Sequence, residues 1–322
     1  MKILVTGATG YIGASVARAL KVAGHDVFGL ARSPDSAARL ELAGLAPVAG
    51  DFADPASLAA AVLGVDAVVS TASTAAMPGQ GNGFDRDQVA VTAMIDALRG
   101  SGKLVIFTSG SAVIGTFTGG ACSDEVHDEY ASLPLAPDSV APPHLNLNPM
   151  LTAALGAAMR ARIDTEKAVL TATGVRGVVI RPGLVYGYGG SFDIPALISA
   201  ARALGGAPHF GEGAFLHSYL HIDDLGELYR LTVEKALRGT VIHGAAADVS
   251  MKDLAGAVNT CLGIDAETVT VSLDEMYAAA GPPGISLALS KRLDTQKTRD
   301  LLGWAPGRTD ILEDVATGSY AS

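Results

Sequence analysis

The chain has 322 residues, of which 49% are apolar, and a formal net charge of −10. It is long enough to bury a large core, and its negative charge argues against nucleic acid or an anionic membrane as a partner. Its two cysteines, Cys122 and Cys261, show no metal-binding or redox spacing. No apolar run approaches the roughly 18 residues of a membrane span and no signal peptide precedes the first strand, so we expect a cytoplasmic protein.

Segments of strand and helix character alternate through the first 180 residues. Short apolar runs predict strands at residues 3–5, 25–30, 47–50, 66–70, 103–108 and 175–180. Apolar residues at helical spacing predict helices at residues 12–20, 34–43, 55–62, 84–99 and 151–173. This alternation predicts a doubly wound, mostly parallel sheet with right-handed crossovers.

A proline-rich stretch at residues 119–149 interrupts this alternation, and after residue 190 the pattern loosens into helices, short strands and loops. The stretch is either a surface loop or, because long ordered loops beside a cofactor cleft often bind substrate, part of the substrate pocket. His127 and His144 lie within it and could line that pocket.

The first predicted strand runs directly into a glycine-rich turn, TGATGYIG, at residues 6–13. Gly7, Gly10 and Gly13 lie between that strand and the first predicted helix, which is the order of the dinucleotide-binding fingerprint. Glycines there allow the turn, let backbone N–H groups approach a pyrophosphate and let the helix pack closely on the strand. A plain tight turn is the alternative, but the flanking strand and helix favour nucleotide binding.

Six segments in the same order carry a resemblance to a known family. They are TGATGYIG at 6–13, GDFAD at 50–54, FTSGSAVIG at 107–115, RPGLVYG at 181–187, HSYLHIDDL at 217–225 and DTQKTRDLLGWAP at 294–306. By these segments the chain resembles the extended short-chain dehydrogenases/reductases of the NAD(P)-dependent epimerase/dehydratase group, and specifically their atypical members.

The resemblance implies an α/β fold with a Rossmann-type doubly wound parallel sheet and a smaller C-terminal substrate lobe. We expect the dinucleotide-binding domain at residues 1–183, completed by a return segment at 222–248. The smaller lobe is then expected at residues 184–221 and 249–322. The resemblance also suggests a homodimer.

The end of the second predicted strand, LARS at residues 30–33, favours NADP(H) over NAD(H). An NAD-specific site usually has an acidic residue there to bind the ribose 2′-hydroxyl, and this chain has none. Arg32 could pair with a 2′-phosphate through two hydrogen bonds, and Ser33 could add its hydroxyl. Lys2 and Arg39 are possible helpers. The alternative is that Arg32 is an ordinary exposed arginine.

The resemblance also supplies the remaining cofactor contacts. It assigns Asp51 to the adenine. It places further contacts at Thr9, Tyr11, Ile12, Phe52, Thr71, Ala72, Ser73, Pro182, Gly183 and Val185.

The usual acid–base pair of the family is missing. Most relatives carry Tyr and Lys four residues apart on the helix before the sixth strand, where Lys binds the nicotinamide ribose and Tyr exchanges a proton with the substrate. Aligning on Lys167 puts Ile163 at the Tyr position, whereas aligning on EKAVL at 166–170 puts Ala158 and Arg162 at the two positions. We prefer the second alignment. Arg162 can bind ribose hydroxyls but cannot donate a proton, because its pKa stays above about 12.

Other residues are candidates for the missing role. Gly110 occupies the position of the family's catalytic serine, so the flanking Ser109 and Ser111 could substitute for it. Tyr186 and His217 are candidate proton donors, since a histidine can titrate near neutral pH. A structural role is the alternative for each of these side chains. The weaker candidates are Tyr188, Tyr219 and His221.

The sequence therefore predicts an NADPH-dependent oxidoreductase that reduces a carbonyl, or an imine, of a small to medium-sized organic molecule with a nonstandard proton donor. One alternative is a nucleotide-sugar epimerase or dehydratase, in which Arg202 and Arg230 would bind the diphosphate. Another is a non-catalytic NADP(H)-sensing protein. Asp223 and Asp224 are expected to begin a helix rather than to act in catalysis.

Overall fold

The computed structural model describes residues 1–74, 83–129 and 149–321. Most of the proline-rich stretch, including His144, lies outside the described residues. Within the described ranges, no helix is both long enough and apolar enough to cross a bilayer.

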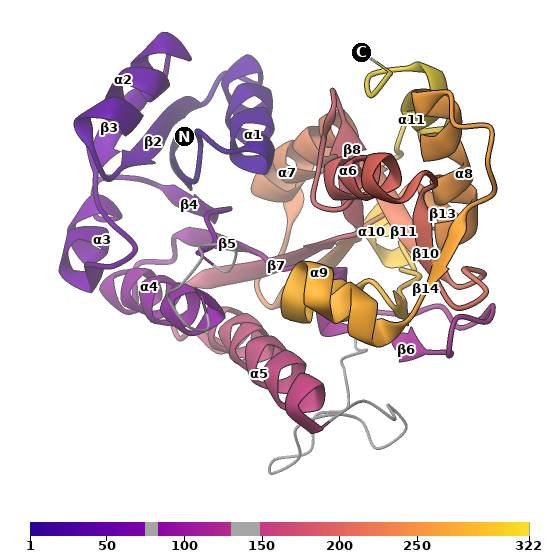
Figure 1. Ribbon diagram of the computed structural model, residues 1–322. Coiled ribbons are helices and arrows are strands. Elements are labelled where there is room, and N and C mark those ends of the chain that lie inside the picture. Colours follow the sequence, from indigo (N-terminus) through magenta and orange to yellow (C-terminus); the bar gives the residue numbers. More distant parts are fainter. Residues whose placement is uncertain (75–82, 130–148, 322) are drawn as a thin grey trace.

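The larger part of the molecule is built on one sheet of seven parallel strands in the order β12-β7-β5-β4-β1-β2-β3 (Figure 1). The strands are β1 (Lys2–Thr6), β2 (Asp26–Ala31), β3 (Ala46–Ala49), β4 (Ala67–Ser70), β5 (Leu104–Thr108), β7 (Arg176–Pro182) and β12 (Thr240–Gly244). All six strands predicted from the sequence are present, within a few residues of their predicted bounds. The order reverses between β1 and β4, which is where an open α/β sheet of this type binds a ligand.

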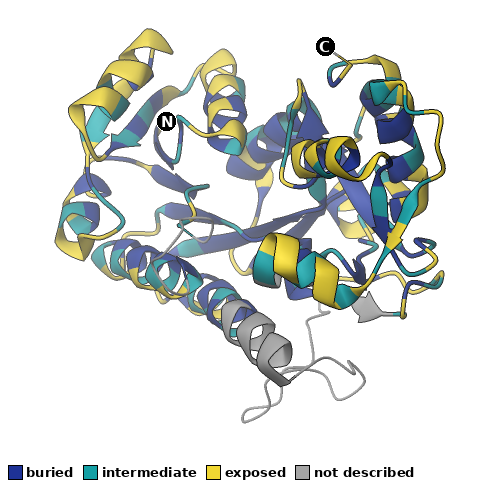
Figure 2. Cartoon of the chain, in the orientation of Figure 1, coloured by how far each residue is buried: buried dark blue, intermediate teal, exposed yellow. Residues whose placement is uncertain are grey.

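Helices cover both faces of this sheet, as the alternating pattern predicts. They are α1 (Tyr11–Val22), α2 (Pro34–Leu42) and α7 (Ile222–Lys235) on one face, and α3 (Pro55–Ala61), α4 (Gly83–Ala97) and α5 (Pro149–Thr171) on the other. The strands between them are largely buried, while the outer sides of the helices are exposed (Figure 2). The chain is therefore a Rossmann-type three-layer α/β structure.

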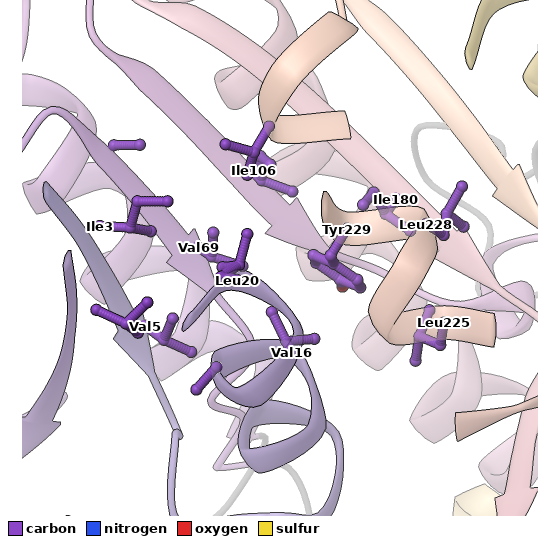
Figure 3. Packing of buried hydrophobic residues seen from close by; sticks show 14 of the residues in the cluster. Ile3, Val5, Val16, Leu20, Val69, Ile106, Ile180, Leu225, Leu228 and Tyr229 are labelled. Carbon is purple, nitrogen blue, oxygen red and sulfur yellow. The ribbon is translucent and has the colours of Figure 1, made fainter. Parts of the chain in front are cut away.

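Close packing of α1 and α7 on the sheet fixes the position of the glycine turn. Figure 3 shows Val16 and Leu20 of α1 in one buried cluster with Leu225, Leu228 and Tyr229 of α7. Burying a Val or Leu side chain contributes about 1.5–3 kcal/mol relative to leaving it exposed. This cluster therefore anchors the first helix, whose amino terminus faces the crevice.

A smaller lobe follows β7 and surrounds a sheet of order β13-β11-β8-β9. Its strands are β8 (Leu184–Gly187), β9 (Gly190–Ser191), β11 (Leu216–His221) and β13 (Ala247–Ser250). Its helices are α6 (Ile194–Leu204), α8 (Met251–Leu262), α9 (Leu273–Ser286) and α11 (Ile311–Thr317), whereas α10 (Gln296–Leu302) packs against α7 and β12 of the larger part. The short strands β6 (Thr116–Phe117) and β15 (Leu289–Ser290) pair with each other, as do β10 (Pro208–Phe210) and β14 (Val269–Val271).

Asp224 joins the carboxyl-terminal segment to the start of α7. Its carboxylate accepts hydrogen bonds from the backbone N–H groups of Gly307, at 3.0 Å, and Arg308, at 2.8 Å. Its backbone carbonyl accepts a third from the Trp304 indole at 3.2 Å. Asp224 at the start of α7 thus holds the segment at 304–308, in agreement with a structural role for it.

Candidate active site

The three glycines of the 6–13 turn are constrained in different ways. Gly7 has φ +73°, and a Cβ atom there would lie 2.9 Å from the backbone of Ala72 after β4. At Gly13, a Cβ atom would lie 2.1 Å from the carbonyl oxygen of Gly7, so no side chain fits between α1 and β1. Gly10 is exposed and precedes α1 without a side-chain cap, which leaves the helix N–H groups available to a phosphate.

The end of β2 places two arginines near the glycine turn. Arg32 is exposed at the strand end, and Arg39 of α2 donates a hydrogen bond to the Thr9 carbonyl oxygen at 3.0 Å. Ser33 caps α2, because its hydroxyl accepts the backbone N–H of Ser36 at 3.2 Å. Lys2 was proposed as a helper but begins β1, at the opposite edge of the sheet, so that prediction is wrong.

The turns after β3 and β4 are fixed by their own hydrogen bonds. The Asp51 carboxylate accepts the N–H of Ala53 at 2.9 Å, with Phe52 partly buried beside it. After β4, the Thr71 hydroxyl donates to the Thr6 carbonyl oxygen at 2.6 Å, and Ser73 donates to the buried Asp87 carboxylate at 2.6 Å. These turns border the crevice between β1 and β4.

Arg162 lies at the carboxyl end of β5. Its guanidinium donates to the Thr108 carbonyl oxygen at 3.1 Å and lies 4.8 Å from the centre of the Phe84 ring. Burial lowers its pKa, while the carboxylates of Asp87 and Glu166 favour the charged form. The structure therefore sets a cation at the β5 end of the crevice, where the preferred alignment expects one.

Lys167, the anchor of the other alignment, points away from this site. Its side chain is 70% exposed and pairs with Asp164 at 3.7 Å. Glu166 points inward instead and binds the Arg181 guanidinium through two nitrogens, with the closest contact at 2.6 Å. The geometry thus favours the alignment on residues 166–170.

Ser109 and Ser111 follow β5 and are both buried. The backbone N–H of Ser109 donates to the Ile180 carbonyl oxygen at 2.8 Å, so Ser109 lies level with Arg181 on β7. Among the described residues, the Ser109 hydroxyl has no hydrogen-bond partner. Gly110 lies beside Arg162, since a Cβ atom there would be 3.8 Å from a guanidinium nitrogen.

The two proposed proton donors have other partners. The Tyr186 hydroxyl donates to the Arg308 carbonyl oxygen at 3.1 Å, and burial raises its pKa, which is opposite to what a proton-exchanging tyrosine needs. Nε2–H of His217 donates to the Leu289 carbonyl oxygen at 2.9 Å. Burial and the nearby charge of Lys291 lower the pKa of His217 well below its usual range, so the ring is neutral. Neither side chain is poised to donate a proton.

The remaining predicted contacts lie along the crevice or in the wall behind it. Tyr11 and Ile12 begin α1, and the Tyr11 hydroxyl donates to the Gly187 carbonyl oxygen at 2.9 Å. Pro182 ends β7, and a Cβ atom at Gly183 would lie 2.3 Å from the Ser218 carbonyl oxygen. The Val185 side chain is buried in the core.

The weaker candidates are also occupied. Tyr188 donates to the Asp223 carboxylate at 2.6 Å, and Tyr219 donates to Asp193 at 2.6 Å. His221 caps α7 by accepting the Asp223 N–H at 3.2 Å. His127 is buried, and burial lowers its pKa.

The sequence analysis did not identify Tyr229, a residue near Arg162. The hydroxyl of Tyr229, on α7, shares a hydrogen bond with the hydroxyl of Thr108. Burial raises the pKa of Tyr229, although Thr108 and Arg162 act in the opposite direction. Its place on the buried face of α7 is readable from the sequence, but its contact with β5 depends on the fold.

Comparisons with known proteins agree with this architecture. Residues 3–140 match the model of the NAD dependent epimerase/dehydratase family. An uncharacterized protein of Schizosaccharomyces pombe is 29% identical over 322 residues, which are 99% of this chain and 100% of that protein. The 2-alkyl-3-oxoalkanoate reductase of Stenotrophomonas maltophilia is 29% identical over 304 residues, 90% of this chain and 79% of the relative.

A solved structure shares the fold over the whole chain. The dTDP-glucose 4,6-dehydratase of Streptomyces venezuelae, solved with NAD bound, superposes with a TM-score of 0.73 at 20% identity, over 100% of this chain and 96% of that one. The family match, the glycine turn and the shared fold point the same way: residues 3–140 are similar to the NAD dependent epimerase/dehydratase family, and the whole chain has the fold of this dehydratase.

Proposed function

We propose that the protein is an NADPH-dependent reductase of a carbonyl, or an imine, in a small to medium-sized organic substrate. The observation that carries the cofactor preference is the end of β2. Arg32 is exposed there, and the acidic residue of an NAD-specific site is missing. Arg39, bound to the glycine turn at Thr9, adds a second positive charge nearby. Two guanidinium groups there suit a 2′-phosphate better than a ribose hydroxyl.

The residues present fit a dinucleotide across the β1–β4 crevice. Gly7, Gly10 and Gly13 would let the pyrophosphate approach the start of α1. Asp51, Phe52 and the turn at 71–73 would border the adenosine half, and the backbone at 182–185 would border the nicotinamide half. When bound, the nicotinamide supplies hydride chemistry.

Arg162 would bind the nicotinamide ribose, because one guanidinium nitrogen is tied to Thr108 and the rest of its fork remains available. The hydroxyls of Ser109 and Ser111 would orient the substrate oxygen. The proton would then come through ordered water, since Tyr186 and His217 are engaged elsewhere.

The relatives and the arginines favour reduction over nucleotide-sugar epimerisation. The Stenotrophomonas relative is named as a reductase of a 2-alkyl-3-oxoalkanoate. Of the two arginines considered for a diphosphate, Arg230 is held between Glu227 and Glu234 on α7, and Arg202 is exposed on α6. The domain division at residues 183, 222 and 248, a homodimer and a cytoplasmic location remain part of this proposal.

The cofactor assignment is tested by titrating NADPH and NADH into the wild type and Arg32→Ala. Losing charge-assisted hydrogen bonds of about 1.5–3 kcal/mol should weaken NADPH binding roughly 10- to 100-fold and leave NADH binding unchanged. Arg202→Ala, which removes an exposed arginine from the lobe, should change neither. An unchanged NADPH/NADH ratio in Arg32→Ala would refute the role of Arg32.

The reaction is tested by following NADPH consumption with neutral ketones, oxo acids and their esters. Net NADPH oxidation with equimolar alcohol formation is expected. Isomerisation or dehydration of a nucleotide sugar without net consumption would instead favour the epimerase/dehydratase alternative. Tight NADPH binding with no turnover of any of these compounds would favour the sensor.

A further inference from the structure

Lys291 is a buried cation that the proposed reaction does not use. It directly follows β15, and its side chain is 1% exposed. None of the ion pairs between described residues includes its ammonium group, and Asp193 is the described carboxylate whose charge acts on it. An isolated buried charge is costly unless it is paired, so a fold that keeps one usually has a use for it.

Backbone pairing places Lys291 where the lobe meets the crevice. Its N–H donates to the Leu216 carbonyl oxygen at 2.8 Å, and its carbonyl oxygen accepts the N–H of Ser218 at 2.9 Å, so it runs beside β11. Ser218 in turn lies against Gly183, after β7. On the other side, a Cβ atom at Gly115 would lie 2.9 Å from Lys291 Cγ. Lys291 therefore lies against the segment that follows β5, and Ser218 separates it from the segment that follows β7.

The nearest polar side chains do not neutralise this ammonium group. His217, opposite Lys291 on β11, is neutral and contacts the backbone carbonyl groups of Leu289 and Leu287, so it brings no negative charge to the ammonium group. Asp193 already accepts hydrogen bonds from the hydroxyls of Tyr219 and Ser191. The Lys291 ammonium group is thus buried without an ion-pair partner among the described residues.

We infer that Lys291 binds a carboxylate of the substrate, which makes the substrate of the proposed reductase an oxo acid. That the substrate has an oxo group rests on the proposed function, whereas that it has a carboxylate rests on the burial and charge of Lys291. A carboxylate brings one negative charge, which one lysine offsets. A nucleotide diphosphate brings at least two, and the described residues supply no second cation beside Lys291.

The subsite can be tested without turnover. Octanoate has a carboxylate that a nicotinamide does not reduce, and octanamide is its neutral match. Calorimetric titration of the full chain, with and without NADPH, should show octanoate binding to the wild type at least tenfold more tightly than to Lys291→Met or Lys291→Gln. Octanamide should bind weakly and equally to all three. Lys252→Met, at an exposed lysine of the same lobe, should behave as the wild type.

Several outcomes separate this inference from the proposed function. Equal octanoate affinity in the wild type and both Lys291 variants would overturn the carboxylate subsite. Binding of UDP but not octanoate, lost in Lys291→Met, would also overturn it, in favour of a diphosphate. Lys291-dependent octanoate binding without NADPH consumption would leave the subsite standing and reject the reductase. In a working reductase, 3-oxooctanoate should lose at least tenfold in kcat/KM in Lys291→Met, and its methyl ester should not.

Discussion

The two edges of the crevice differ in the groups that form them. At the glycine-loop edge, formed by the carboxyl ends of β1, β2 and β3, backbone groups and exposed arginines face the space for a cofactor. At the β5–β7 edge, polar side chains are buried and bound to one another, as in the pair Arg181–Glu166. The first edge depends on close backbone contacts, and the second on long-range side-chain pairs. Cofactor binding can therefore persist while the groups that act on substrate change.

The largest effect is expected at the glycine-loop edge. Gly13→Ala puts a methyl group 2.1 Å from the Gly7 carbonyl oxygen, so α1 must move away from β1. We expect a loss of at least about 3 kcal/mol in the free energy of unfolding, as for overpacked core sites, together with a loss of NADPH binding. Denaturant unfolding and fluorescence titration measure the two.

Gly256→Ala in α8 is the matched control, because a Cβ atom there meets nothing within 4 Å. A glycine-to-alanine change in a helix interior normally stabilises by about 0.5–1 kcal/mol. If Gly13→Ala behaved like Gly256→Ala, the close approach at the glycine turn would have to be abandoned as the reason for its sequence.

This edge is also the part of the site that sequence reasoning could find. Glycines at 7, 10 and 13 and the arginine at 32 act through local backbone geometry, which a short motif specifies. The β5–β7 edge could not be found in that way. The contacts of Arg162 with Thr108, and of Tyr186 with Arg308, join residues 54 and 122 positions apart. Tyr186 and His217 were reasonable proton donors by residue type, and only the fold shows that their polar atoms already have partners.

The β5–β7 edge is probed by Arg181→Met. This change leaves the Glu166 carboxylate buried without its cation, which should cost about 3–5 kcal/mol in the free energy of unfolding. Burial and, to a lesser degree, the positive charge of Arg181 lower the pKa of His243 to about 4. The pKa of His243 should therefore rise in Arg181→Met. Urea denaturation and NMR titration of the histidines measure these effects.

Arg230→Met is the control for an exposed ion pair. Arg230 pairs with Glu227 and Glu234 on the outer side of α7, and such pairs are worth about 0–1 kcal/mol. Similar losses in Arg181→Met and Arg230→Met would contradict the contrast drawn between a buried and an exposed pair.

A smaller effect than that of Arg181→Met is expected at Lys291, and it has the opposite sign. Burial lowers the pKa of Lys291 to about 8, below its ordinary value of 10.5. Below pH 8 the lysine is charged in both the folded and the unfolded protein. The cost of burying this charge destabilises the folded protein alone. Between pH 8 and pH 10.5 the folded protein has lost the proton while the unfolded chain still binds it, so stability rises with pH in this window.

Lys291→Met should therefore be more stable than the wild type by about 1–3 kcal/mol at pH 7, and the difference should shrink toward zero as the pH approaches 10.5. Urea denaturation of both proteins across this pH range measures it, with Lys252→Met as a control that should show no such trend. A Lys291→Met protein that is less stable than the wild type at pH 7 would mean that the ammonium group is already satisfied within the fold, and a subsite for a substrate carboxylate would lose its physical basis.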